Sequence, residues 1–235
     1  MKPSIILSAL LILVLSFSGC KDKEKVIEVV EEVPEDVYHI ELCESLSSSV
    51  MDLFVESHDN KEKYPQLFSG SQEQIVLTKA TNVYISYVTE GAAIPSTLGW
   101  YIYTGNAPAA SADVEKKILF PNVSSSVLNP GDTRMLGNFP AGTVIGFYLI
   151  VGGYNNSTVN YSKPTYYTNF SWNPGSYRQH VLFREENCNN ILMGFEDKAI
   201  ETGSDSDYND IIFMISDNDD NQASTSFDQN TMVAM

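Results

Sequence analysis

The segment Thr143-Val-Ile-Gly-Phe-Tyr-Leu-Ile-Val151 combines β-branched, aliphatic and aromatic residues and contains no charged side chain. An uncharged run of this length, apolar on both faces, predicts a fully buried β-strand. Gly146 lies inside the run, where a glycine indicates a bulge or a close approach of another part of the backbone. We therefore place the main buried strand of the fold here.

Shorter runs rich in β-branched and aromatic residues lie on both sides of this strand, bounded by Gly, Pro and Asn. They are residues 74–78, 83–88, 98–103, 180–183, 191–193 and 208–215. Between residues 46 and 54 the apolar residues recur at helical spacing, which predicts one short N-terminal helix. The sequence thus predicts an all-β fold, an antiparallel β-sandwich resembling a jelly roll. This domain is expected to span residues 38–216, and an acidic flexible tail is expected over 217–235.

The composition restricts the class of protein. The chain has 235 residues, of which 43% are hydrophobic, so it is long enough to bury a sizeable core. It carries 14 Lys plus Arg against 30 Asp plus Glu, a formal net charge of −16. Nucleic-acid binding requires clustered cations, so nucleic acid is excluded as a partner. Acidity of this degree fits extracellular solubility and divalent cations.

The first twenty residues indicate export. A short basic start, an apolar run and a small-residue end describe a secretory signal over residues 1–19 and not a membrane span. The end of this segment, Phe17-Ser-Gly-Cys20, resembles a bacterial lipobox, which implies lipidation of Cys20 as the mature N-terminus. The alternative is an ordinary signal peptide with an incidental cysteine. We expect a membrane partner through this lipid.

Residues 20–37 are charged and free of glycine, and we expect them to form a solvated tether. Lysines and acidic residues directly after the cysteine resemble the surface-export signals of Bacteroidetes lipoproteins. The expected location is the outer membrane or cell surface, lipid-anchored and facing the periplasm or the exterior.

Two cysteines remain in the body of the chain, Cys43 and Cys188. An exported protein meets an oxidising compartment, so a disulfide between them is one expectation. Two separately buried thiols are the alternative. Neither cysteine has a neighbouring histidine in a pattern that would suggest catalysis.

Acidic residues concentrate near the end of the predicted domain. Residues 185–220 contain eleven Asp or Glu and one basic residue, Lys198. Calcium takes six to eight oxygen ligands from carboxylates, amides and carbonyls, and it would neutralise such a cluster. The alternative is a solvated acidic loop. The three histidines are scattered and no Cys/His spacing fits zinc.

The loop Ser204-Asp-Ser-Asp-Tyr-Asn-Asp210 alternates oxygen-bearing side chains. It is not an EF-hand, because the position for the turn glycine holds Asp210 and the last ligand position holds Ser216. On an extended backbone Asp207 and Asn209 share one face. We expect Asp205 to join them there. Glu196 and Asp197 are expected to arrive from the preceding strand.

Gly194-Phe-Glu-Asp197, followed by Ser204–Asp210 and an apolar strand, resembles the signature of LruC-type domains, a bacterial family of unknown function. Blocks similar to the family occur in order over residues 75–216. The resemblance implies a calcium-binding, cell-surface or secreted β-sandwich with no established activity. It carries the metal-ligand role to Glu196, Asp197, Asp205, Asp207, Asn209 and Asp210. Glu90, in Thr89-Glu-Gly-Ala92, is a further candidate ligand, or a surface carboxylate at a turn.

The leading hypothesis is a calcium-stabilised surface lipoprotein module with a binding or adhesion role and a surface glycan or protein partner. A glycan-binding module is the first alternative, because the aromatic residues between Tyr154 and Trp172 could stack on sugar rings. Trp100, Tyr101 and Tyr148 are expected in the core.

A carboxylate-dependent glycoside hydrolase is a further alternative, which would need one buried acid with a raised pKa in a cleft. The acids cluster in one loop, and no nucleophile elbow, zinc-protease motif or phosphate loop occurs. His180 lies in a predicted strand and is expected to be a packed side chain and not a base. We therefore expect no enzyme.

Overall fold

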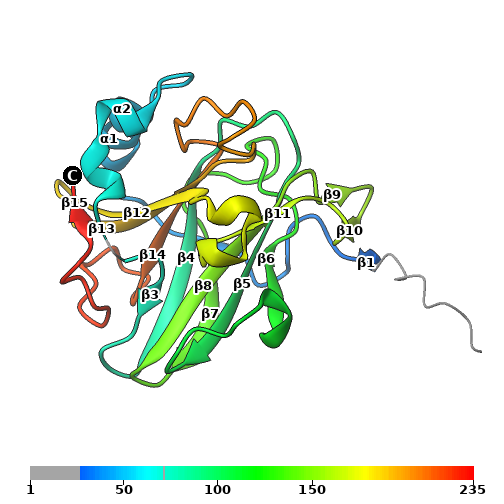
Figure 1. Cartoon of the computed structure of the whole chain (residues 1–235). Helices are drawn as coiled ribbons and strands as arrows, with labels where there is room; N and C mark the ends of the chain where they lie inside the picture. The colour runs from blue at the N-terminus through cyan, green and yellow to red at the C-terminus, as the bar shows by residue number, and fades with distance from the viewer. Residues whose placement is uncertain (1–26, 71) are drawn as a thin grey trace, which may run out of the picture.

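The computed structural model describes residues 27–70 and 72–235. The expected signal peptide (residues 1–19), the lipidated Cys20 and the first part of the tether lie outside these residues. Two sheets pack face to face, with helical segments at one end (Figure 1). Within the described residues, no helix is both long enough and apolar enough to span a bilayer.

The larger sheet has seven strands in the order β15-β12-β13-β14-β4-β7-β2. All its pairs are antiparallel except β12 with β15. The strands are β2 (Tyr38–His39), β4 (Thr81–Thr89), β7 (Asp132–Phe139), β12 (His180–Glu185), β13 (Asn190–Phe195), β14 (Ile211–Ser216) and β15 (Val233–Ala234).

The smaller sheet has five strands in the order β11-β8-β5-β6, with β3 also paired to β8. They are β3 (Ile75–Val76), β5 (Thr97–Thr104), β6 (Lys116–Phe120), β8 (Thr143–Ile150) and β11 (Thr165–Tyr167). The uncharged run that starts at Thr143 forms β8, and β8 pairs with three other strands. The prediction of an all-β antiparallel sandwich is confirmed.

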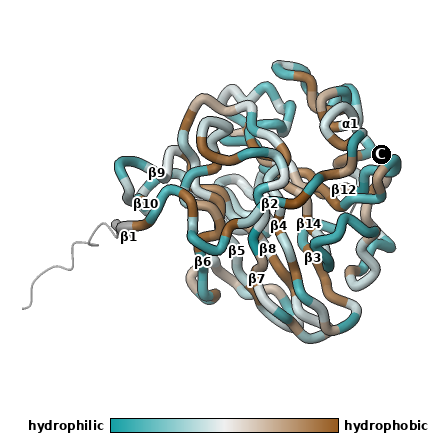
Figure 2. The backbone as a smooth tube through the Cα atoms, turned by 180° about the vertical axis from the view of Figure 1, so that it is seen from behind, coloured by the Kyte–Doolittle hydropathy of each residue, from teal (hydrophilic) through white to brown (hydrophobic). Residues whose placement is uncertain are grey.

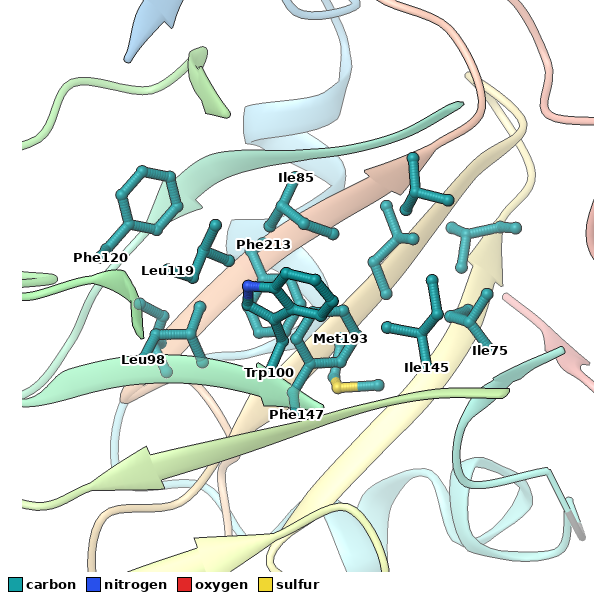
Figure 3. Close-up of a cluster of buried hydrophobic side chains, with 14 of the residues drawn as sticks. Ile75, Ile85, Leu98, Trp100, Leu119, Phe120, Ile145, Phe147, Met193 and Phe213 are labelled. Carbon is teal, nitrogen blue, oxygen red and sulfur yellow. The ribbon is translucent and has the colours of Figure 1, made fainter. Parts of the chain in front are cut away.

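The main core lies between the two sheets. Along β8, Ile145 and Phe147 point into it and are fully buried. Figure 3 shows Trp100 and Phe147 of the smaller sheet approaching Met193 and Phe213 of the larger one. Figure 2 shows hydrophobic residues along the interior strands and hydrophilic residues in the peripheral loops and the β9–β10 hairpin.

Two glycines admit tyrosine rings on the outer face of the smaller sheet. Gly146 is paired with Tyr101, and Gly99 is paired with Tyr148. A Cβ atom at either glycine would collide with the ring opposite. The close approach expected at Gly146 therefore exists, but an aromatic side chain makes it and not the backbone. Both tyrosines are buried, as predicted.

Helical segments cover the outer face of the larger sheet. They are α1 (Leu46–Leu53), α2 (Asn60–Lys63) and the 3-10 turn η1 (Pro65–Phe68). The predicted helix corresponds to α1, whose Leu46 and Val50 pack on the sheet in a second apolar cluster. Further 3-10 turns are η2 (Ser111–Asp113), η3 (Phe170–Trp172) and η4 (Pro174–Ser176).

The second half of the expected tether is largely exposed, but it lies against the folded body. From residue 27 it runs along the body, and β1 (Ile27–Val29) pairs with β10 (Thr158–Asn160), which pairs with β9 (Tyr154–Asn155). Asp36 accepts a 2.6 Å ion-paired hydrogen bond from Arg134. Backbone pairing of this kind depends little on side-chain identity, so the charged composition concealed it.

The segment 217–235 is also not a free tail. Phe227 is 4% exposed and its backbone bridges Leu77, and β15 adds a parallel edge strand to β12. The Asp217 carboxylate accepts backbone hydrogen bonds from Thr225 and Ser226, which folds the segment back on itself. Phe227 and the pairing of β15 therefore anchor the segment.

Candidate metal centre

The acidic loop connects β13 to β14, and its backbone takes an unusual path. Ser206 and Tyr208 both have left-handed backbone conformations, with φ of 61° and 60°. Such positions are costly for residues other than glycine and need support from their surroundings. Gly194 allows this backbone path, because a Cβ atom at position 194 would collide with the carbonyl oxygen of Tyr208.

Glu196 holds this loop from inside. Its carboxylate accepts hydrogen bonds from the backbone N–H of Tyr208 at 2.8 Å and from the Ser204 hydroxyl at 2.6 Å. Burial, together with the negative charges of Asp207 and Asp205, raises the pKa of Glu196 to about 7 against these hydrogen bonds. In this structure Glu196 therefore positions the loop.

Three carboxylates from two distant segments converge at the loop. One oxygen each from Glu56, Asp205 and Asp207 lies within 4.8 Å of the other two. Glu56 comes from the segment between α1 and α2, which lies beside the orange loop in Figure 1. Among residues 27–70 and 72–235, no other three His, Cys, Asp or Glu residues gather in this way. We call this set the carboxylate triad.

Hydrogen bonds join the two segments at the triad. The backbone N–H of Ser57 donates to the Asp207 carboxylate at 2.8 Å. Asn60 donates from its backbone to the Ser206 carbonyl at 2.9 Å and from its side chain to the Asp207 carbonyl at 2.6 Å. The Asp207 carboxylate is buried beside Asp205 and Glu56, and burial first, then these charges, raise its pKa.

An unsatisfied oxygen lies next to this junction. Asn60 is 0% exposed, and its Oδ1 has no hydrogen-bond partner among the described residues. Buried polar atoms are nearly always paired, so this oxygen is an acceptor available to a cation or a water at the junction. The donor set is carboxylate and amide oxygen with no sulfur or imidazole, which suits a hard cation such as Ca²⁺.

Asn209 was predicted as a metal ligand, and in the structure its side chain hydrogen-bonds to one carboxylate of the triad. Its side-chain amide donates to the Glu56 carboxylate at 3.1 Å and to the Phe54 carbonyl at 3.3 Å. Its Oδ1 lies against Gly91, where a Cβ atom would collide with it. In this structure Asn209 therefore orients Glu56.

Two of the remaining predicted ligands, Asp197 and Asp210, form a separate pair. Asp210 accepts a 2.6 Å hydrogen bond from the backbone N–H of Asp197. Burial raises the pKa of both carboxyl groups, and their proximity adds to the shift of Asp210. Glu90 accepts a hydrogen bond from the backbone N–H of Ser125 at 3.0 Å and contributes negative potential at Asp197. None of these three belongs to the triad.

Sequence reasoning missed Glu56 because the residue lies about 150 positions from its partners. The only available signal was the run of polar side chains from Glu56 to Asn60, directly after the predicted helix. The structure brings Asp205 and Asp207 together, as their alternation predicted. Glu196, Asp197 and Asp210 lie outside the triad, but near enough for their charges to interact with Asp205 or Asp207.

A disulfide joins Cys43, before α1, to Cys188, in the β12–β13 turn, with 6.1 Å between the Cα atoms. It therefore attaches the segment that carries Glu56 to the larger sheet.

His180 is 0% exposed and its Nε2 donates to the Glu73 carbonyl at 3.0 Å. Burial, with a contribution from Arg178, lowers its pKa to about 3, so it is a neutral packed residue.

The aromatic residues between Tyr154 and Trp172 do not form an exposed platform. Tyr154 and Tyr166 are 7% and 8% exposed. Trp172 packs against Tyr101 with 5.1 Å between ring centroids, and its Nε1 donates to the Pro108 carbonyl. Tyr154 and Trp172 belong to a third apolar cluster on the smaller sheet.

Comparison with known proteins adds one result. Residues 139–218 match a family model described as a domain of unknown function (DUF4114). The matched range begins at the end of β7 and ends just after β14, so it contains Asp205 and Asp207 but not Glu56. No curated protein and no solved structure matches the chain.

Proposed function

We propose that this chain is a calcium-binding β-sandwich module, of the LruC type that its signature resembles, on a lipid-anchored protein outside the cytoplasm. Its role is binding or adhesion without catalysis. The observation that supports it best is the carboxylate triad of Glu56, Asp205 and Asp207 beside the unpaired Oδ1 of Asn60.

Calcium would connect two parts of the chain that repel each other without it. The triad places three negative charges within 4.8 Å, and one of them, Asp207, is buried. Like charges at this distance destabilise the folded state, and a divalent cation reverses the sign of the interaction. Binding to the folded state alone would add about 2.7 kcal/mol at a calcium concentration one hundred times Kd.

The lipid anchor and the extracytoplasmic location rest on the signal-like start and Cys20, and the disulfide is compatible with them. Disulfides persist in oxidising compartments. Mass spectrometry of the mature protein tests this part of the proposal. A diacylated Cys20 supports it, and an unmodified N-terminus elsewhere overturns it. Cys20→Ala should abolish acylation and release the protein from membranes.

The metal proposal is tested by melting the full chain in excess EDTA and in millimolar calcium. The wild type should gain several degrees in calcium. Glu56→Gln and Asp207→Asn should lose most of this gain. Glu56→Gln keeps the test interpretable if Asp207→Asn does not fold, because Glu56 is exposed.

The matched control is Asp52→Asn, an exposed carboxylate on α1 outside the triad. It should retain the full calcium response. An absent calcium response in the wild type, or an equal response in Glu56→Gln, would overturn the proposal. Magnesium and zinc arms establish which cation the site prefers.

A further inference from the structure

A cavity of about 360 Å³ opens away from the carboxylate triad, between the segment before β3, the end of β5 and the C-terminal segment. Its polar lining comes from Gln72, Glu73, Gln74, Tyr103, Asn169 and Asp228. We call it the polar pocket. We propose that the polar pocket binds a neutral saccharide. This proposal does not depend on the calcium site.

The hydrogen-bonding wall of the polar pocket is held rigid from behind. Gln74 is 7% exposed and uses both ends of its amide, accepting from the Tyr103 hydroxyl at 2.5 Å and donating to the Tyr101 hydroxyl at 3.1 Å. The Tyr101 hydroxyl also accepts from the backbone N–H of Asn169 at 3.2 Å. Fixed polar groups recognise ligand hydroxyls at a low entropic cost.

The aromatic segment supports this wall. Asn169 precedes η3, and its Oδ1 accepts from the backbone N–H and hydroxyl of Ser171. Its Nδ2 donates to no described residue, and Asn169 lines the pocket. Trp172, the last residue of η3, packs on Tyr101. The rings near Trp172 thus position a polar rim and do not themselves stack on a sugar.

The charge of the polar pocket excludes anionic ligands. Two carboxylates, Glu73 and Asp228, line it, and no Lys, Arg or His among the described residues does so. The nearest guanidinium, that of Arg178, is committed to the carbonyls of Gly70 and Gln72 at 3.2 and 2.9 Å. Carboxylates accept strongly from hydroxyl donors, which sugars present in number.

The pocket does not resemble a second cation site. Glu73 and Asp228 have no third His, Cys, Asp or Glu partner that would make a ligand group among the described residues. The apolar part of the lining comes from Val76, Val144 and Ala107. Apolar side chains, a tyrosine ring and amide and carboxylate groups together suit the apolar faces and hydroxyl edge of a pyranose, and the volume suits one or two rings.

The experiment is a titration of the full chain with a panel of neutral sugars, followed by isothermal calorimetry and amide NMR. The panel contains glucose, galactose, mannose, N-acetylglucosamine and their common disaccharides, up to tens of millimolar. We expect at least one to bind and to shift amides around Gln74 and Asn169. Tyr103→Ala and Asp228→Asn should each weaken that binding at least tenfold.

Tyr177→Ala is the matched control, because Tyr177 is 43% exposed and does not line the pocket. Its affinity should equal that of the wild type, and the melting temperature of every variant is recorded. Binding that survives Tyr103→Ala, preference for glucuronate over glucose, or no shift with any neutral sugar would overturn the proposal. Repeating the titration in EDTA separates this result from the fate of the calcium proposal.

Discussion

Replacing Glu56 by Gln should change the stability of the protein in opposite directions with and without calcium. In EDTA the triad oxygens of Glu56, Asp205 and Asp207 repel one another within 4.8 Å. At that distance a pair of unit charges costs about 1 kcal/mol in water and several times more in a protein interior, and the exposure of Glu56 favours the lower figure. Gln keeps an oxygen to accept from Asn209 while removing the charge.

The variant should therefore equal or exceed the wild type in EDTA, by up to about 1 kcal/mol, which is roughly 2–4 °C for a chain of this size. In calcium the order should reverse. At one hundred times the wild-type Kd, the wild type gains about 2.7 kcal/mol. If loss of one carboxylate ligand weakens binding tenfold, the variant gains about 1.4 kcal/mol.

Differential scanning calorimetry at several calcium concentrations measures both effects on one sample. The reversal is the diagnostic feature, since an ordinary structural residue would lose the same stability in both conditions. Equal destabilisation of Glu56→Gln in EDTA and in calcium would refute the reasoning. Asp52→Asn should show neither the gain in EDTA nor the smaller response to calcium.

Three other predictions follow from the same structure. Between pH 6.5 and 8 in EDTA the melting temperature should fall, because burial raises the pKa of Glu196 from 4.5 to about 7 and that of Asp210 from 3.8 to about 8, and the protonated forms of both groups are lost as pH rises; calcium should flatten this profile. His180, with its pKa lowered from 6.5 to about 3, acts in the opposite direction only below pH 6.5. Gly146→Ala should cost about 1–3 kcal/mol by chemical denaturation, because the new methyl group meets the facing tyrosine ring. Replacing Cys43 and Cys188 by Ser should cost about 2–4 kcal/mol by the same assay.

Each of these has an outcome that contradicts it. A melting temperature that rises from pH 6.5 to 8 in EDTA would show that neither Glu196 nor Asp210 is held protonated. An unchanged Gly146→Ala would mean that the smaller sheet can shift to admit a methyl group. For the double Ser variant, equal denaturation midpoints under oxidising and reducing conditions are the control, since the bond is already absent.

The fold was predictable where the sequence carries repeated local signals. The uncharged run of β8 and the helical spacing of α1 each depend on several neighbouring residues that agree. The pairing of β1 and the packing of the C-terminal segment could not be predicted in this way. Phe227 is one apolar residue in a polar stretch, and β1 pairs through backbone groups that any side chain permits.

The candidate site divides in the same manner. Asp205 and Asp207 share a short loop, so their alternation predicted their proximity. Glu56 reaches them only through the packing of α1 on the larger sheet, which no spacing rule encodes. Asn209 has the right position for a ligand, but its amide donates to Glu56, and sequence cannot tell a ligand from a neighbour that orients one.

The Cys43–Cys188 bond has a consequence beyond the free energy of unfolding. It closes 145 residues of chain and leaves Glu56 a short segment away from an anchored point on the larger sheet. With that point fixed, Glu56 meets Asp205 and Asp207 at a high effective concentration. Reduction lowers this effective concentration, so calcium affinity should report the oxidation state of the chain.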